Sequence, residues 1–105
     1  MFRLTEEKIS KWGEKKKANK LIKAAMNKSG NIRLAAIKAM GNVGTENVIN
    51  VLITTLRDRE PEIRIAALDS LAKIKNKIAI EHIKSLINDS DPNVSQKAKE
   101  ALKEF

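Results

Sequence analysis

The stretch EIRIAALDSL at residues 62–71 decides the fold, because a close copy, NIRLAAIKAM, stands 31 residues earlier at 31–40. A weaker copy, NVSQKAKEAL, follows at 93–102. The same offset aligns turn residues as well as apolar ones, placing Asp58 on Asp89 and Pro61 on Pro92. Self-similarity at a fixed period of this size is the signature of a repeat protein.

Each repeat has the pattern of two helices. Pro61 suits the first turn of a helix, where its missing N–H is not needed, and Thr45 can cap a helix that begins near Glu46. After Pro61, apolar or small residues recur with helical spacing at Ile63, Ala66, Ala67, Ser70, Leu71 and Ile74. No segment alternates as a strand would. The pattern predicts seven helices, at 4–12, 15–28, 31–42, 46–57, 62–74, 78–88 and 93–104.

The segment PEIRIAALDSL at 61–71 resembles the D-P-x-V-R-x-x-A-A-x-A-L pattern of HEAT repeats, of the short kind called PBS-lyase HEAT-like. NIRLAAIKAMG at 31–41 is similar to it, and the resemblance covers 18–105 well and 1–17 poorly. Ser95 and Lys97 depart from it, as expected of a C-terminal capping repeat that faces water. The resemblance implies an all-α, right-handed α-solenoid of about three helix pairs.

The resemblance also implies how the single domain, 1–105, is organised. Its parts are a lysine-rich N-terminal cap and first unit (1–30), the two clearest repeats (31–61 and 62–92) and a C-terminal capping helix (93–105). The helices at 31–42, 62–74 and 93–104 would line the inner, concave side. Arg64 would meet Asp58 in the preceding turn, whereas Asn27 takes the place of that aspartate beneath Arg33 and leaves the series incomplete.

Large aliphatic residues stand on the inner helices where polar side chains usually suit such repeats. On a helical wheel of 62–74, Ile65 points away from the core face and Leu68 lies on its flank. We expect an apolar strip that suits the apolar face of a partner helix or of a second copy of this chain. The alternative is that neighbouring inner helices cover these side chains. The strip comprises Leu34, Ile37, Ile65 and Leu68, edged by Lys38, Asp69 and Lys73.

The positive charge is concentrated at the N-terminal end. The net charge is +8, and residues 1–30 hold nine basic and three acidic groups, or +6 of it. Phosphate contacts from such a cluster would give salt-sensitive binding without sequence preference, but no aromatic residue interleaves it to stack bases. Nucleic-acid binding is therefore the alternative to protein binding. The cluster comprises Lys15, Lys16, Lys17, Lys20 and Lys23.

The composition offers little for catalysis. There is no cysteine and no tyrosine, and His82 is the single histidine, whereas a zinc site needs three or four convergent ligands. We expect no catalytic residue, no metal and no cofactor. No apolar run spans a bilayer, and the first ten residues lack a secretory pattern, so we expect a cytoplasmic protein. The sequence predicts a small adaptor or scaffold that binds another protein through its inner helices.

Overall fold

The computed structural model describes residues 3–105; Met1 and Phe2, and with them the start of the expected unit 1–30, lie outside the described residues. Over 3–105 the chain forms helices and turns and no strand, which confirms the all-α class. The α-helices are α1 (Glu6–Glu14), α2 (Ala18–Ala24), α3 (Gly30–Ala39), α4 (Glu46–Thr55), α5 (Pro61–Ile74), α6 (Ile80–Lys84) and α7 (Pro92–Leu102), with 3-10 helices η1 (Met40–Asn42) and η2 (Lys77–Ala79).

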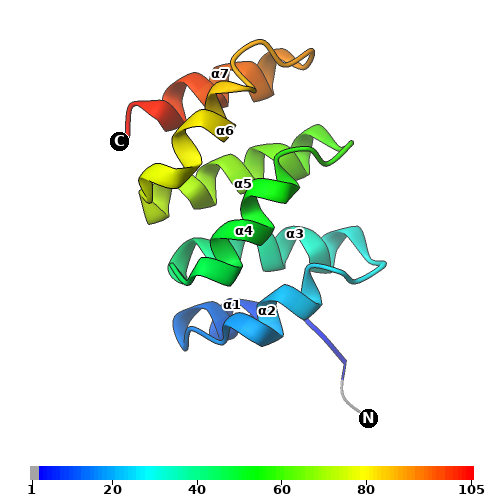
Figure 1. The fold of residues 1–105 in the computed structure, drawn as a ribbon. Helices are drawn as coiled ribbons and strands as arrows, with labels where there is room; N and C mark the ends of the chain where they lie inside the picture. Colours follow the sequence, from blue (N-terminus) through cyan, green and yellow to red (C-terminus); the bar gives the residue numbers. More distant parts are fainter. Residues whose placement is uncertain (1–2) are drawn as a thin grey trace.

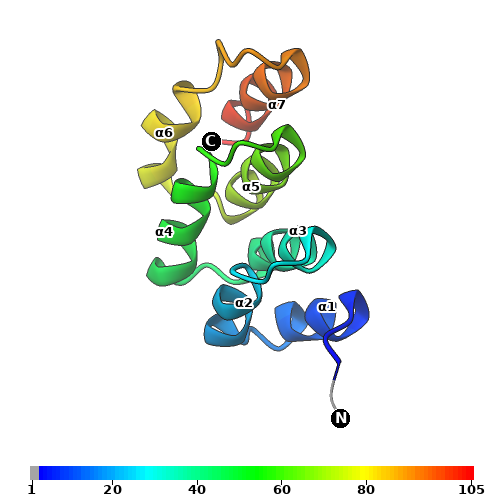
Figure 2. The same cartoon turned by 90° about the vertical axis from the view of Figure 1, so that its right-hand side faces the viewer.

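The helices form two layers (Figures 1 and 2). Helices α1, α3, α5 and α7 lie side by side in one layer, here called the inner layer, and α2, α4 and α6 make up the outer layer. Each inner helix packs against the inner helix of the next repeat, and the outer helices pack against the inner helices beside them. The result is an elongated α-solenoid measuring 44 × 24 × 17 Å.

The core lies between the two layers and consists of aliphatic side chains that recur at the repeat offset. Leu21, Leu52 and Ile83 of the outer helices are fully buried, and so are Met40 and Leu71 from the inner layer. Burying one such side chain contributes about 1.5–3 kcal/mol. The stack is therefore stabilised mainly by aliphatic side chains that the two layers bury between them.

The starts of the helices agree with the sequence. The Thr45 hydroxyl accepts a hydrogen bond from the Val48 N–H at 3.4 Å, which confirms the predicted cap of α4. Pro61 and Pro92 occupy the first positions of α5 and α7, where the missing N–H leaves no intrahelical bond unmade.

Two outer helices are shorter than predicted. Helix α2 begins at Ala18 because Lys16 adopts a left-handed conformation with φ of 55°, which interrupts the predicted helix 15–28. Helix α6 ends at Lys84 rather than 88, since the N–H groups of Leu86 and Ile87 bond three residues back instead of four. The tight turns after Lys84 end α6 and lead the chain back toward the inner layer.

Each arginine of α3 and α5 reaches an aspartate in the turn that leads into the next inner helix. Arg33 Nη2 lies 3.4 Å from Asp58 Oδ2, and Arg64 Nη2 lies 3.1 Å from Asp89 Oδ1. The expected contact of Arg64 with Asp58 is present, but it does not use the Asp58 carboxylate, which accepts hydrogen bonds from Arg33 and from the Glu60 N–H. Arg64 donates instead to the Asp58 backbone carbonyl at 2.7 Å.

Arg33 has acidic partners, although Asn27 in the preceding turn led us to expect that the arginine–aspartate series would be incomplete there. Arg33 finds Asp58 and Glu60 in the next turn, while Asn27 caps its own turn by accepting the Ser29 N–H at 2.8 Å. Asp58 and Asp89 cap their turns in the same way. Ser95, at the equivalent position of α7, ends the series, since its hydroxyl donates to the backbone carbonyl of Ile87 in the segment before α7.

Candidate functional site

The expected apolar strip of the inner layer is only partly exposed. Leu34 and Ile65 are half-buried and pack at the edge of the core. The expectation that Ile37 and Leu68 share that surface is wrong, because they are 2% and 0% exposed. An inner helix of a solenoid has a neighbour on each flank as well as the outer layer behind it, so flank positions are buried between adjacent inner helices.

The expected charged edge is at the surface. Lys38, Asp69 and Lys73 are exposed. Asp69 pairs with Lys97 of α7 at 3.3 Å, and Lys73 donates to the Asn42 side chain at 2.6 Å. The two contacts join α5 to α7 and to η1, and they hold the side chains of Asp69 and Lys73 in place.

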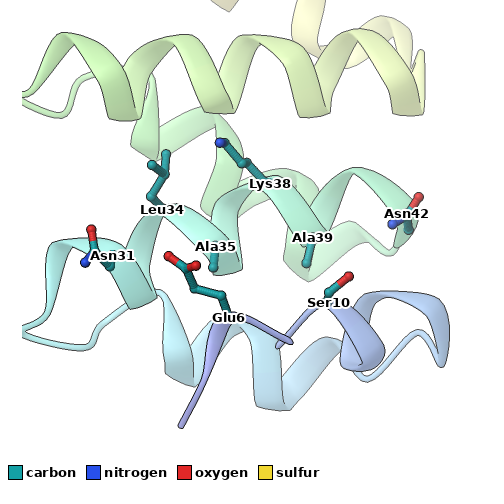
Figure 3. Close-up of a pocket in the computed structure, with 8 residues that line it drawn as sticks. All are labelled: Glu6, Ser10, Asn31, Leu34, Ala35, Lys38, Ala39 and Asn42. Carbon is teal, nitrogen blue, oxygen red and sulfur yellow. The ribbon is translucent and has the colours of Figure 1, made fainter. Parts of the chain in front are cut away.

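A hollow of about 330 Å³ opens between α1 and α3, next to Leu34 and Lys38. Figure 3 shows the Glu6 carboxyl group and the Ser10 hydroxyl extending from α1 toward α3. Its lining combines the apolar Leu34, Ala35 and Ala39 with polar side chains of α1, α3 and η1, so the hollow can receive a side chain of a partner and form hydrogen bonds with its polar groups. Its lining comprises Glu6, Ser10, Asn31, Leu34, Ala35, Lys38, Ala39 and Asn42.

The hollow exists because α1 lacks the aliphatic residue that fills the same place in later repeats. At the repeat offset, Glu6 corresponds to Ile37 and Leu68, which are buried in the core. Glu6 itself is exposed. This site was not predicted from the sequence, although the polar Glu6 at a repeat position that is otherwise aliphatic was a signal that could have indicated it.

The five expected lysines lie together at the N-terminal end of the stack. Lys15, Lys16 and Lys17 form the turn between α1 and α2, and Lys20 and Lys23 lie on α2. All five are exposed, and within residues 3–105 none of them forms an ion pair. The Lys20 ammonium lies 5.4 Å from the centre of the Trp12 ring. The structure therefore places an aromatic side chain beside the cluster, which the sequence alone did not reveal.

Comparison with protein families decides what this architecture is. The family model described as HEAT repeats matches residues 9–104. The chain belongs to the HEAT-repeat family. The match spans every helix from α2 to α7 and most of α1, and it confirms the resemblance seen in the sequence. A search of curated proteins found no match.

HEAT repeats commonly act as scaffolds for protein interaction, and their curved stacks offer extended surfaces to a partner. In the described part of this HEAT-repeat chain, no group of three or more His, Cys, Asp or Glu side chains could hold a metal ion. His82 is an exposed residue of α6. None of the helices in residues 3–105 combines the length and the apolar character needed to cross a membrane.

Proposed function

We propose that this chain is a small scaffold module that binds another protein through its inner layer without catalysing a reaction. The observation that carries the proposal is the hollow between α1 and α3, with Leu34 half-buried at its edge and Lys38 exposed beside it. A hollow lined by both apolar and polar side chains, beside an exposed charge, is an arrangement by which one protein anchors a side chain of another.

The partner surface that fits is an amphipathic one. Its apolar side chain would contact Leu34, Ala35 and Ala39, and its polar groups would meet Asn31 and Lys38 on the rim. Ile65 and the charges of Asp69 and Lys73 extend the same surface along α5. A partner helix or a second copy of this chain could present such a face, and the first is favoured because the hollow is small.

The experiment compares three proteins as baits in a native lysate, with bound proteins identified by mass spectrometry. They are the parent chain, Lys38→Glu in the inner layer, and Lys77→Glu, which makes the same charge change in η2 at an exposed lysine. Each capture is run with and without nuclease.

We expect a set of proteins that the parent and Lys77→Glu both retain and that Lys38→Glu loses, unchanged by nuclease. Since Lys38 and Lys77 are both exposed, both variants should unfold at the temperature of the parent, and circular dichroism checks this. The proposal is wrong if Lys38→Glu retains the same proteins as the parent. A set that disappears on nuclease treatment would favour the nucleic-acid alternative through Lys15, Lys16 and Lys17.

A further inference from the structure

Helices α1 and α2 lie at the N-terminal end of the stack (Figure 1). A second hollow, of about 600 Å³, is lined by residues of these two helices and of the segments beside them. It shares none of its lining with the hollow between α1 and α3. Met26 at its edge is 79% exposed, the most exposed of the large apolar side chains in residues 3–105. No described residue covers this surface. Its lining comprises Leu4, Trp12, Lys20, Lys23, Ala24, Met26 and Asn27.

The charge around this hollow is strongly positive and uncompensated. Lys20 and Lys23 line the hollow. Lys15, Lys16 and Lys17 lie in the turn between α1 and α2, just before them in the chain. Within residues 3–105 none of the five pairs with a carboxylate. A positive rim around an apolar floor attracts and orients a partner of negative charge.

We propose that this hollow binds an acidic amphipathic segment of a protein partner. An apolar side chain of the segment enters between Leu4, Trp12 and Met26, and flanking Asp or Glu residues pair with Lys20 and Lys23. Methionine adapts its shape to varied apolar ligands, and a lysine can cover an aromatic ring with its stem while its ammonium remains available to a carboxylate. This surface is separate from the inner-layer site and acts as a second docking point.

A nucleic acid fits the same hollow less well. Proteins that bind single strands stack successive bases on several aromatic side chains. Among residues 3–105, Trp12 is the only aromatic residue that lines this hollow, and Lys20 already lies over its ring. The apolar residues Leu4, Ala24 and Met26 have no counterpart in a sugar–phosphate chain. The charge complementarity and the apolar floor together favour an acidic protein segment.

The single tryptophan provides the assay. The chain has one Trp and no Tyr, so its fluorescence under 295 nm excitation comes from Trp12 inside the hollow. The probes are three synthetic helical peptides with the same Leu and Met residues on one face and with acidic, neutral or basic residues on the other. We expect the acidic peptide to shift the Trp12 emission to shorter wavelength and to bind about tenfold tighter than the neutral one, which two exposed ion pairs can supply.

Matched variants locate the binding. Lys20→Glu with Lys23→Glu should remove the preference for the acidic peptide, whereas Lys99→Glu with Lys103→Glu, an equal change of charge on exposed residues near the other end of the chain, should leave it. Met26→Asp should weaken all three peptides without unfolding the chain, since Met26 is exposed. Lys38→Glu should have no effect, which separates this site from the inner-layer site.

Two results would overturn the proposal. One is an acidic peptide that binds no better than the neutral peptide, or whose binding falls equally in both lysine variants. The other is a single-stranded oligonucleotide that changes Trp12 emission at physiological salt and displaces the acidic peptide, because the hollow would then be a nucleic-acid site.

Discussion

Removing the guanidinium of Arg64 should destabilise the protein far more than removing that of Arg33. The two arginines occupy equivalent positions 31 residues apart and pair with equivalent aspartates. Their burial differs. The side chains of Arg64 and Asp89 are 12% and 10% exposed, whereas those of Arg33 and Asp58 are 27% and 26% exposed.

The burial sets the expected magnitudes. Removing one partner of a buried ion pair costs about 3–5 kcal/mol because the other charge is left without a partner, whereas exposed pairs contribute about 0–1 kcal/mol. Arg64→Met should lower the free energy of unfolding by about 3 kcal/mol. The low end of the range applies because the Asp89 carboxylate still accepts a hydrogen bond from the Asp91 N–H. Arg33→Met should lower the free energy of unfolding by about 1 kcal/mol. Since each kcal/mol corresponds to about 4 °C in Tm, we expect Tm to fall by about 12 °C in Arg64→Met and by about 4 °C in Arg33→Met.

Urea unfolding followed by circular dichroism at 222 nm measures both losses. A third variant, Arg64→Met with Asp89→Asn, removes the charge from both partners. Asn27 shows that an asparagine can cap this turn, so we expect the double variant to recover more than half of the loss. Equal losses for Arg33→Met and Arg64→Met, or no recovery in the double variant, would refute burial as the cause.

Three further predictions concern two buried residues of α5 and the lysine cluster. Ala67 is fully buried, so Ala67→Asp should cost about 3–5 kcal/mol in urea unfolding, and a loss below 1 kcal/mol would show that α5 can shift to expose the charge. Ser70 donates to the Ile37 carbonyl at 2.7 Å in the core, so Ser70→Ala should cost about 1 kcal/mol, and an unchanged midpoint would show that the carbonyl is satisfied otherwise. The parent should retard nucleic acid on native gels at low salt alone, and Lys15→Glu with Lys16→Glu and Lys17→Glu should abolish this; tight binding at physiological salt would contradict it.

The fold could be predicted from the sequence because the repeat supplies each structural signal more than once. Pro61 and Pro92 mark the starts of two inner helices, and the Thr45 cap marks the start of α4. The extent of the outer helices was harder to predict. Helix α6 ends in turns with bonds three residues back, and the sequence pattern over 85–88 does not distinguish such turns from a further helical turn.

The candidate site was predicted in part, and the errors share one cause. A helical wheel of one helix identifies the side that faces the outer layer, but it does not show that α3 and α7 cover both flanks of α5. Leu68 was therefore expected at the surface although it lies in the core. The Asp89 partner of Arg64 was missed similarly, because that aspartate lies 25 residues further along, in the turn that leads into α7.

The arginine contacts have a consequence for how such a chain can change in length. Arg33 and Arg64 each reach an aspartate 25 residues further along, and each turn is capped by its own Asn or Asp. A duplicated copy of residues 31–61 would thus bring its own arginine, its own aspartate and its own buried leucine. The chain can grow by whole repeats without a new kind of contact, and the surface of its inner layer lengthens with each one.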